Sequence, residues 1–193
     1  ETLYDKSLRL YEQGFYEEAA KMLSTVLAED PNDVKAAVLL ARVYANQGKL
    51  AEASRCSEQA VAADRLNPFC HILQATILQE QGAIPEAARA LQRALYLEPN
   101  LVLAHFALGN IARRQEKLRE ATRHFDNVRA LLGAYSPEQV LPEFDGMTAG
   151  RLMEIIRSTR GTPVSAVGGE PRINLSSAAA DKFLRNRVQE KRR

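Results

Sequence analysis

The 193-residue chain has no tryptophan, only two cysteines and few aromatic side chains of any kind. Cys56 and Cys70 cannot build a disulfide framework and lack the spacing of a zinc site, so we expect small buried hydrophobic residues in a reducing compartment. No apolar stretch approaches the roughly 20 residues of a membrane span, and no signal-like segment opens the chain. We therefore expect a soluble, cytoplasmic protein without a membrane span.

The chain also lacks an excess of charge of one sign, with 26 basic and 24 acidic side chains. Residues 1–160 carry 19 basic and 21 acidic side chains, whereas residues 161–193 carry seven basic and three acidic. A body of mixed charge has no cluster of Lys and Arg to bind a phosphate backbone, so nucleic acid is not an expected partner. An apolar content of 46% is enough to build a core, which excludes wholesale disorder.

An internal repeat with an interval of 34 residues is the strongest positive feature of the sequence. A fixed period of this length is typical of solenoid proteins. Alanine and glutamate recur together, and a glutamine recurs a few residues earlier. The recurring positions are Ala19, Ala53, Ala87 and Ala121; Glu18, Glu52, Glu86 and Glu120; and Gln13, Gln47, Gln81 and Gln115.

Each repeat has the pattern of a helical hairpin. In the fourth copy, apolar residues recur at intervals of three and four over Leu108–Ala112 and again over Leu118–Val128, which predicts two amphipathic helices. The turn between them holds glycine in the first three copies and Glu116 in the fourth. Glycine at that place suits the left-handed backbone that ends a helix, and the recurring alanine lets the second helix approach the first closely.

These residues resemble the tetratricopeptide repeat (TPR) family. The fourth copy follows the family order most closely, with Leu108, Gly109, Ala112, Ala121 and Phe125. The resemblance implies an all-α fold, a right-handed superhelical solenoid of about four TPR hairpins plus a C-terminal capping helix. The expected layout is four repeats over residues 1–133 (about 1–33, 34–67, 68–101 and 102–133), a linker and capping helix over 134–160, and a flexible basic tail over 161–193.

The capping helix is expected after Asp145 or Thr148, either of which can cap its start, with Gly161 at its end. Its buried stripe is expected to hold Leu152, Met153, Ile155 and Ile156. Residues 161–193 are rich in Gly, Ser, Pro and Ala, which indicates a linker. Within this tail, residues 176–189 are compatible with one further short helix.

No motif in the chain indicates catalysis. The sequence contains no GxGxxG, GxxxxGK[ST], HExxH, GxSxG or CxxC pattern. His71 and His105 lie one repeat apart at positions where the family buries an aromatic residue, and His124 is expected on the outer side of a second helix. We therefore predict no catalytic, cofactor-binding or metal-binding residue, and the chain by itself is not expected to be an enzyme.

The family resemblance implies a partner-binding concave wall built from the first helix of each hairpin. Such a wall, mainly apolar with a basic end, would suit a protein or peptide with an apolar anchor and acidic flanks. The inward-facing positions in this chain are Tyr4, Leu8, Tyr11, Val38, Leu39, Arg42, Phe69, Ile72, Leu73, Thr76, Phe106, Asn110, Arg113 and Arg114.

A finer resemblance rests on about 40 residues, within 101–125 and 145–158. They are similar to the C-terminal repeat region of CheR-like, chemotaxis-type protein methyltransferases. This likeness implies a docking or regulatory piece of an enzyme that methylates receptor glutamates. The S-adenosylmethionine-dependent catalytic domain would lie upstream, and a chemoreceptor or that domain would be the partner. A free-standing adaptor in another assembly, such as secretion or cell-envelope work, is the alternative. An RNA-binding helical repeat is a further alternative, which the interval of 34 and the body charge disfavour.

Overall fold

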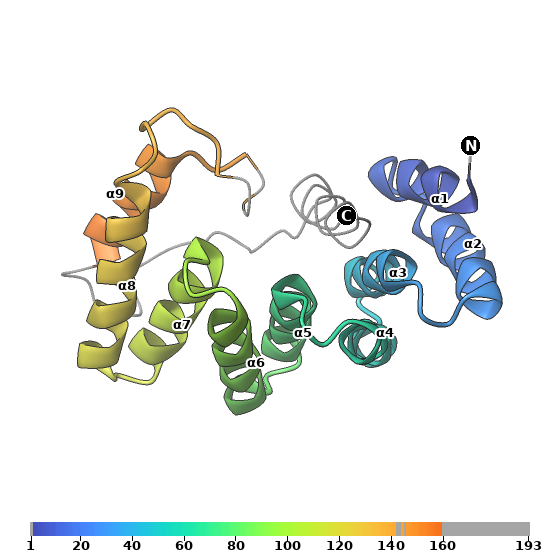
Figure 1. Ribbon diagram of the computed structural model, residues 1–193, viewed down its shortest axis with the longest axis horizontal. Helices are drawn as coiled ribbons and strands as arrows, with labels where there is room; N and C mark the ends of the chain where they lie inside the picture. Colours follow the sequence, from blue (N-terminus) through green and yellow to red (C-terminus); the bar gives the residue numbers. More distant parts are fainter. Residues whose placement is uncertain (1, 142–143, 145, 160–193) are drawn as a thin grey trace. The chain divides into compact units, whose positions relative to one another are not determined.

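The computed structural model describes residues 2–141, 144 and 146–159, and within them the secondary structure is helical apart from one isolated bridge between Val140 and Thr148. Figure 1 labels the helices in chain order. Their bounds are α1 (Leu3–Glu12), α2 (Tyr16–Glu29), α3 (Val34–Asn46), α4 (Leu50–Ala63), α5 (Pro68–Glu80), α6 (Ile84–Leu97), α7 (Val102–Arg114), α8 (Leu118–Leu132) and α9 (Ala149–Thr159). The all-α helical repeat fold expected from the sequence is confirmed.

The first eight helices form four hairpins, one within each predicted repeat. Gly14, Gly48 and Gly82 have φ angles of 84°, 72° and 79°, so the turn of the first three hairpins uses the left-handed backbone for which glycine is suited. Glu116 adopts the same region with φ 60°. The turn geometry is therefore retained in the fourth hairpin although its glycine is absent.

The recurring alanine lies at the contact between the two helices of each hairpin. Ala19, Ala53 and Ala87 are fully buried, and Ala121 is 4% exposed. The two helices of each hairpin pack against each other, pairing α1 with α2, α3 with α4, α5 with α6, and α7 with α8. A small side chain at this position permits the close approach that the sequence predicts.

Residues 1–97 form the first of two compact units. Its first helices, α1, α3 and α5, contact one another in turn, and each second helix packs against the next first helix (Figure 1). Gln81, one of the recurring glutamines, contributes to this stacking, because its side-chain amide donates a hydrogen bond to the Leu50 carbonyl at 3.0 Å. Gln59 likewise donates to the Pro31 carbonyl at 2.7 Å.

Residues 98–193 form the second unit, which the structure describes as far as residue 159. Here α9 packs against α8, and its N-terminus is capped by the Thr148 hydroxyl, which accepts from the Arg151 amide at 3.2 Å. Leu152 and Ile156 are fully buried, whereas Met153 and Ile155 are half-buried. The capping helix is thus confirmed. The predicted tail and its short helix lie outside the described residues.

Candidate partner-binding surface

The structure buries most of the side chains that the sequence places on the concave wall. Three are half-buried, namely Tyr4, Leu8 and Thr76, and Arg114 is exposed. The buried ones are Tyr11, Val38, Leu39, Arg42, Phe69, Ile72, Leu73, Phe106, Asn110 and Arg113. A role for these residues in binding a partner remains a prediction.

The burial of Phe106 has a cause within its own unit. Its ring packs against Phe125 of α8, with ring centroids 6.2 Å apart. On another side it meets Phe144 in an edge-to-face arrangement at 6.1 Å. The segment that connects α8 to α9 therefore contributes an aromatic ring to the α7 surface. Phe106, 1% exposed, is a core aromatic residue in this unit.

In the first unit, Tyr11 of α1 and Arg42 and Asn46 of α3 form a polar cluster. The guanidinium carbon of Arg42 lies 4.8 Å from the centroid of the Tyr11 ring, which is a cation–π distance. The Tyr11 hydroxyl oxygen accepts a hydrogen bond from Arg42 Nη2 at 3.3 Å and another from Asn46 Nδ2 at 3.0 Å. We call these three residues the Arg42 cluster.

The Arg42 cluster is rich in donors and has no anionic acceptor among the described residues. Arg42 is 4% exposed, and its Nε is buried without a hydrogen-bond partner. Buried charges in proteins are normally paired, since an uncompensated one is costly. Asn46 is exposed, so the cluster reaches the surface through this residue.

Sequence reasoning identified Tyr11 and Arg42 but missed Asn46. The available signal was its position four residues after Arg42, which places both side chains on one face of α3. The contact of both with Tyr11 joins two hairpins, and repeat periodicity alone does not specify which side chains meet there.

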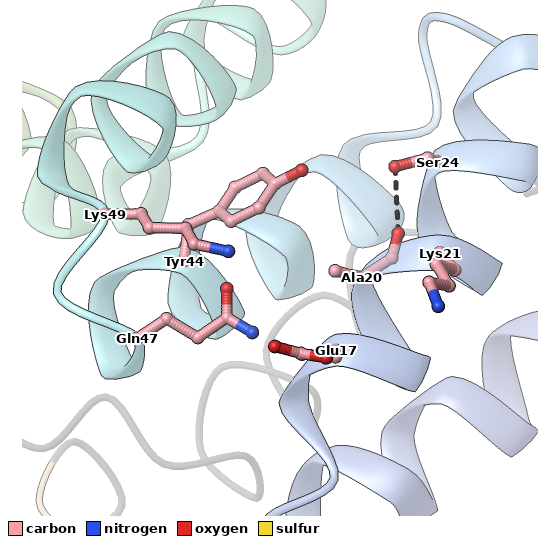
Figure 2. Close-up of a pocket in the computed structure, with 7 residues that line it drawn as sticks. All are labelled: Glu17, Ala20, Lys21, Ser24, Tyr44, Gln47 and Lys49. Carbon is pink, nitrogen blue, oxygen red and sulfur yellow. Dashed lines mark hydrogen bonds between the residues drawn. The ribbon is translucent and has the colours of Figure 1, made fainter.

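A pocket of about 230 Å³ lies between α2 and α3 in the first unit (Figure 2). The Glu17 carboxylate and the Gln47 amide point toward one another in it, and Lys49 Nζ lies 6.0 Å from the centroid of the Tyr44 ring. Gln47 Oε1 is buried without a hydrogen-bond partner. Charges of both signs line this pocket. Its lining residues are Glu17, Ala20, Lys21, Ser24, Tyr44, Gln47 and Lys49.

His124 does not lie where the sequence placed it. It was expected on the outer side of its helix, but it is 7% exposed and its Nδ1 lies 3.1 Å from the Nδ1 of His105. The opposite ring nitrogen of His105, Nε2, lies 3.0 Å from the Pro99 carbonyl oxygen. The expectation was wrong because His124 faces α7, where the partly buried His105 offers it a polar partner.

Burial shifts the pKa values of these imidazoles and of both thiols. Desolvation lowers the pKa of His105 below its ordinary value, as it does for His124, where the neighbouring His105 lowers it further. Burial raises the pKa of the Cys56 thiol to about 11 and that of Cys70 to about 12. Both cysteines are free, and near neutral pH their thiols are protonated and poorly reactive.

Comparison with protein families identifies the repeats. Two family models, each described as tetratricopeptide repeat, match residues 10–77 and 72–134. Residues 10–134 are tetratricopeptide repeats. Repeats of this kind present extended surfaces for protein partners, and this chain is a protein–protein interaction module of that type.

Solved structures similar to the chain have the same repeat fold. The structure titled "MamA 41-end from Desulfovibrio magneticus RS-1" is 24% identical with a TM-score of 0.64, over 69% of this chain and 76% of that one. "Crystal structure of MamA protein" is 17% identical with a TM-score of 0.63, over 98% and 92% of the two chains. At these identities the likeness establishes the fold alone. Comparison with curated proteins finds no relative that matches the chain.

Two further properties concern the described residues only. None of their helices is both long enough and apolar enough to cross a bilayer. They contain no group of three or more His, Cys, Asp and Glu side chains arranged to hold a metal ion.

Proposed function

We propose that the chain is a tetratricopeptide-repeat adaptor whose first three hairpins bind a protein segment carrying a carboxylate beside an apolar side chain. The Arg42 cluster supports this proposal. The guanidinium carbon of Arg42 lies 4.8 Å from the centroid of the Tyr11 ring, and the guanidinium has no carboxylate partner among the described residues. A partner Asp or Glu would supply the acceptor that the cluster lacks, in the form of a charge-assisted hydrogen bond.

The apolar part of the partner has its counterpart on α1. Tyr4, Leu8 and Tyr11 recur at intervals of four and three, so they share one face of that helix. Tyr4 and Leu8 are half-buried, which leaves part of each side chain at the surface on the helix face that also carries Tyr11. An apolar anchor on this face with an acidic residue next to it matches the partner expected from the sequence.

A peptide-display selection tests the proposal. The immobilised chain is expected to enrich peptides that carry Asp or Glu next to a large apolar residue. Because it loses the charge, Arg42→Gln should bind such peptides about tenfold more weakly, roughly 1.4 kcal/mol. Arg93→Gln is the matched control, since Arg93 is an exposed arginine on α6, the second helix of the third hairpin. Equal affinity of wild-type and Arg42→Gln protein for the enriched peptides would place the binding site elsewhere.

The methyltransferase hypothesis is a finer version of this function. In it, the repeats dock a CheR-like enzyme on a chemoreceptor, or on the enzyme's own catalytic domain, and S-adenosylmethionine binds only upstream of this chain. Its support is the sequence resemblance within residues 101–125 and 145–158, and the comparisons with known proteins do not link the chain to such enzymes. A methyltransferase domain in the same coding sequence would support it, whereas a coding sequence without one would leave the free-standing adaptor.

A further inference from the structure

The tautomers of His105 and His124 follow from their hydrogen bonds. A carbonyl oxygen only accepts, so the contact with the Pro99 oxygen requires His105 Nε2 to carry the proton. The Nδ1 of neutral His105 then carries a lone pair, and it accepts a hydrogen bond from the Nδ1–H of His124, with the two nitrogens 3.1 Å apart. The backbone therefore holds one imidazole with its free nitrogen aimed at the second ring.

A histidine that binds a metal ion often has the same arrangement as His105, with one ring nitrogen held by a carbonyl oxygen and the other free to bind the ion. Histidines that bind metals commonly donate their other ring N–H to a backbone carbonyl or carboxylate, which fixes the ring and the tautomer. Two nitrogens 3.1 Å apart, each about 2.05 Å from one ion, subtend an angle of about 100° at that ion. This angle lies between those of square-planar and tetrahedral coordination.

We propose that His105 and His124 together bind a divalent transition-metal ion of the class that prefers imidazole, Zn²⁺, Ni²⁺ or Cu²⁺, through their Nδ1 atoms. Binding needs no net loss of a proton, because neutral His124 transfers its ring proton from Nδ1 to Nε2 when Nδ1 becomes a ligand. Water completes the coordination, since the described residues place no third ligand of the His, Cys, Asp or Glu kind beside the pair.

The electrostatic surroundings of the pair are mixed. Arg123 disfavours positive charge at both imidazoles, and Glu120 favours it at His124. Burial keeps the pair neutral, which is the form that binds metal. The two buried thiols do not compete because their raised pKa values leave them protonated near neutral pH.

A matched control exists one repeat earlier. His71 holds the position equivalent to His105, and its Nε2 likewise lies 3.0 Å from a carbonyl oxygen, that of Arg65. Its Nδ1 is buried without a hydrogen-bond partner, and Ala90 occupies the position in α6 that His124 occupies in α8. His71 is therefore a single imidazole in the same backbone setting.

Calorimetric titration of the untagged, metal-free full chain with ZnCl₂, NiCl₂ and CuCl₂ at pH 7.5 tests the proposal. We expect one ion per chain, with binding weakened at least tenfold in His124→Gln and in His105→Ala, and unchanged in His71→Ala. His124→Gln retains an N–H donor for His105 while removing the ligand, and circular dichroism verifies that each variant is folded. Imidazole ¹⁵N spectra should show both Nδ1 resonances shifting on addition of Zn²⁺. The proposal is overturned if none of the three ions binds, or if His124→Gln binds as tightly as the wild-type chain.

Discussion

The hairpin α5/α6 and the hairpin α7/α8 use the same backbone design with different side chains at equivalent positions. In the first, His71 has an unsatisfied Nδ1, and Ala90 holds the position equivalent to His124; in the second, His105 meets His124. Ala75 and Leu91 in the first hairpin are replaced by Gly109 and Phe125 in the second. In the second comparison, a change on one helix of the hairpin is thus accompanied by a change on its partner helix.

Gly109 illustrates this pairing in atomic detail. A Cβ added there would lie 2.6 Å from Phe125 Cε1, which is closer than van der Waals contact allows. The larger Phe125 ring therefore requires a residue without a side chain on α7. In the preceding hairpin, the smaller Leu91 holds the position equivalent to Phe125, and α5 carries Ala75 at the position equivalent to Gly109.

The largest expected effect concerns the two buried residues at the equivalent positions Ile72 and Phe106. Phe106→Ala should lower the free energy of unfolding by about 3–5 kcal/mol and Ile72→Ala by about 2–5 kcal/mol, because each leaves a cavity in its core. Urea unfolding followed by circular dichroism measures both. Tyr96→Ala is the control, since Tyr96 is 89% exposed and should shift stability by less than about 0.5 kcal/mol. A loss at Phe106 no larger than that of the control would mean that this ring does not belong to the core.

Gly109→Ala is expected to destabilise the chain by about 1–2 kcal/mol, because the Phe125 ring must move and the better helix propensity of alanine offsets only part of that cost. In a Phe125→Leu background, which resembles the α5/α6 hairpin, the same substitution should be neutral or stabilising. A double-mutant cycle by urea unfolding measures this coupling. Equal losses in the two backgrounds would show that the two positions do not interact.

The two hairpins also begin differently. Asn67 caps α5 by accepting a hydrogen bond from the Phe69 amide at 3.0 Å, whereas Leu101 precedes α7 without a side-chain cap. Asn67→Ala should therefore cost about 1 kcal/mol, as measured by thermal and urea unfolding. Asn100→Ala, at an exposed position just before α7, serves as the control and should change stability by less than about 0.5 kcal/mol. Matching losses at Asn67 and Asn100 would contradict the assigned capping role.

The smallest expected effect is a gain of stability at the turn of the fourth hairpin. Glu116 has φ 60° where the third hairpin has Gly82 with φ 79°. Glu116→Gly should raise the free energy of unfolding by about 0.5–1 kcal/mol, because relief of the left-handed strain exceeds the added flexibility of the unfolded chain. Gly82→Ala should lower it by a similar amount. A thermal unfolding series would contradict this account if Glu116→Gly destabilised the chain.

The helical pattern could be predicted closely because its causes are local and repeated. The left-handed turns at Gly14, Gly48 and Gly82 follow from residues within the turns themselves. The buried Ala19, Ala53 and Ala87 follow from one small residue at a fixed interval. Periodic signals of this kind reinforce one another over four copies, so no single departure, such as Glu116, obscures them.

The candidate sites could be predicted only in part. Tyr11 and Arg42 were placed on the same wall, but their stacking and the contribution of Asn46 depend on the contact between two hairpins. His124 was expected on the wrong side of α8, although Cys56 and Ala90 at the equivalent positions of the two preceding hairpins are buried apolar residues. A period of 34 residues describes what the copies share, and these contacts arise where the copies differ.

The sequence by itself determined the helical repeat and the glycine turns of the first three hairpins, because each depends on residues close together in the chain. The tertiary structure decided which side chains meet between helices. Phe144 packs on Phe106 from the segment that follows α8, and His105 meets His124 across a hairpin. Such contacts depend on the packing of particular side-chain shapes between helices, and the burial of a charge or an imidazole becomes known only when its neighbours are in place.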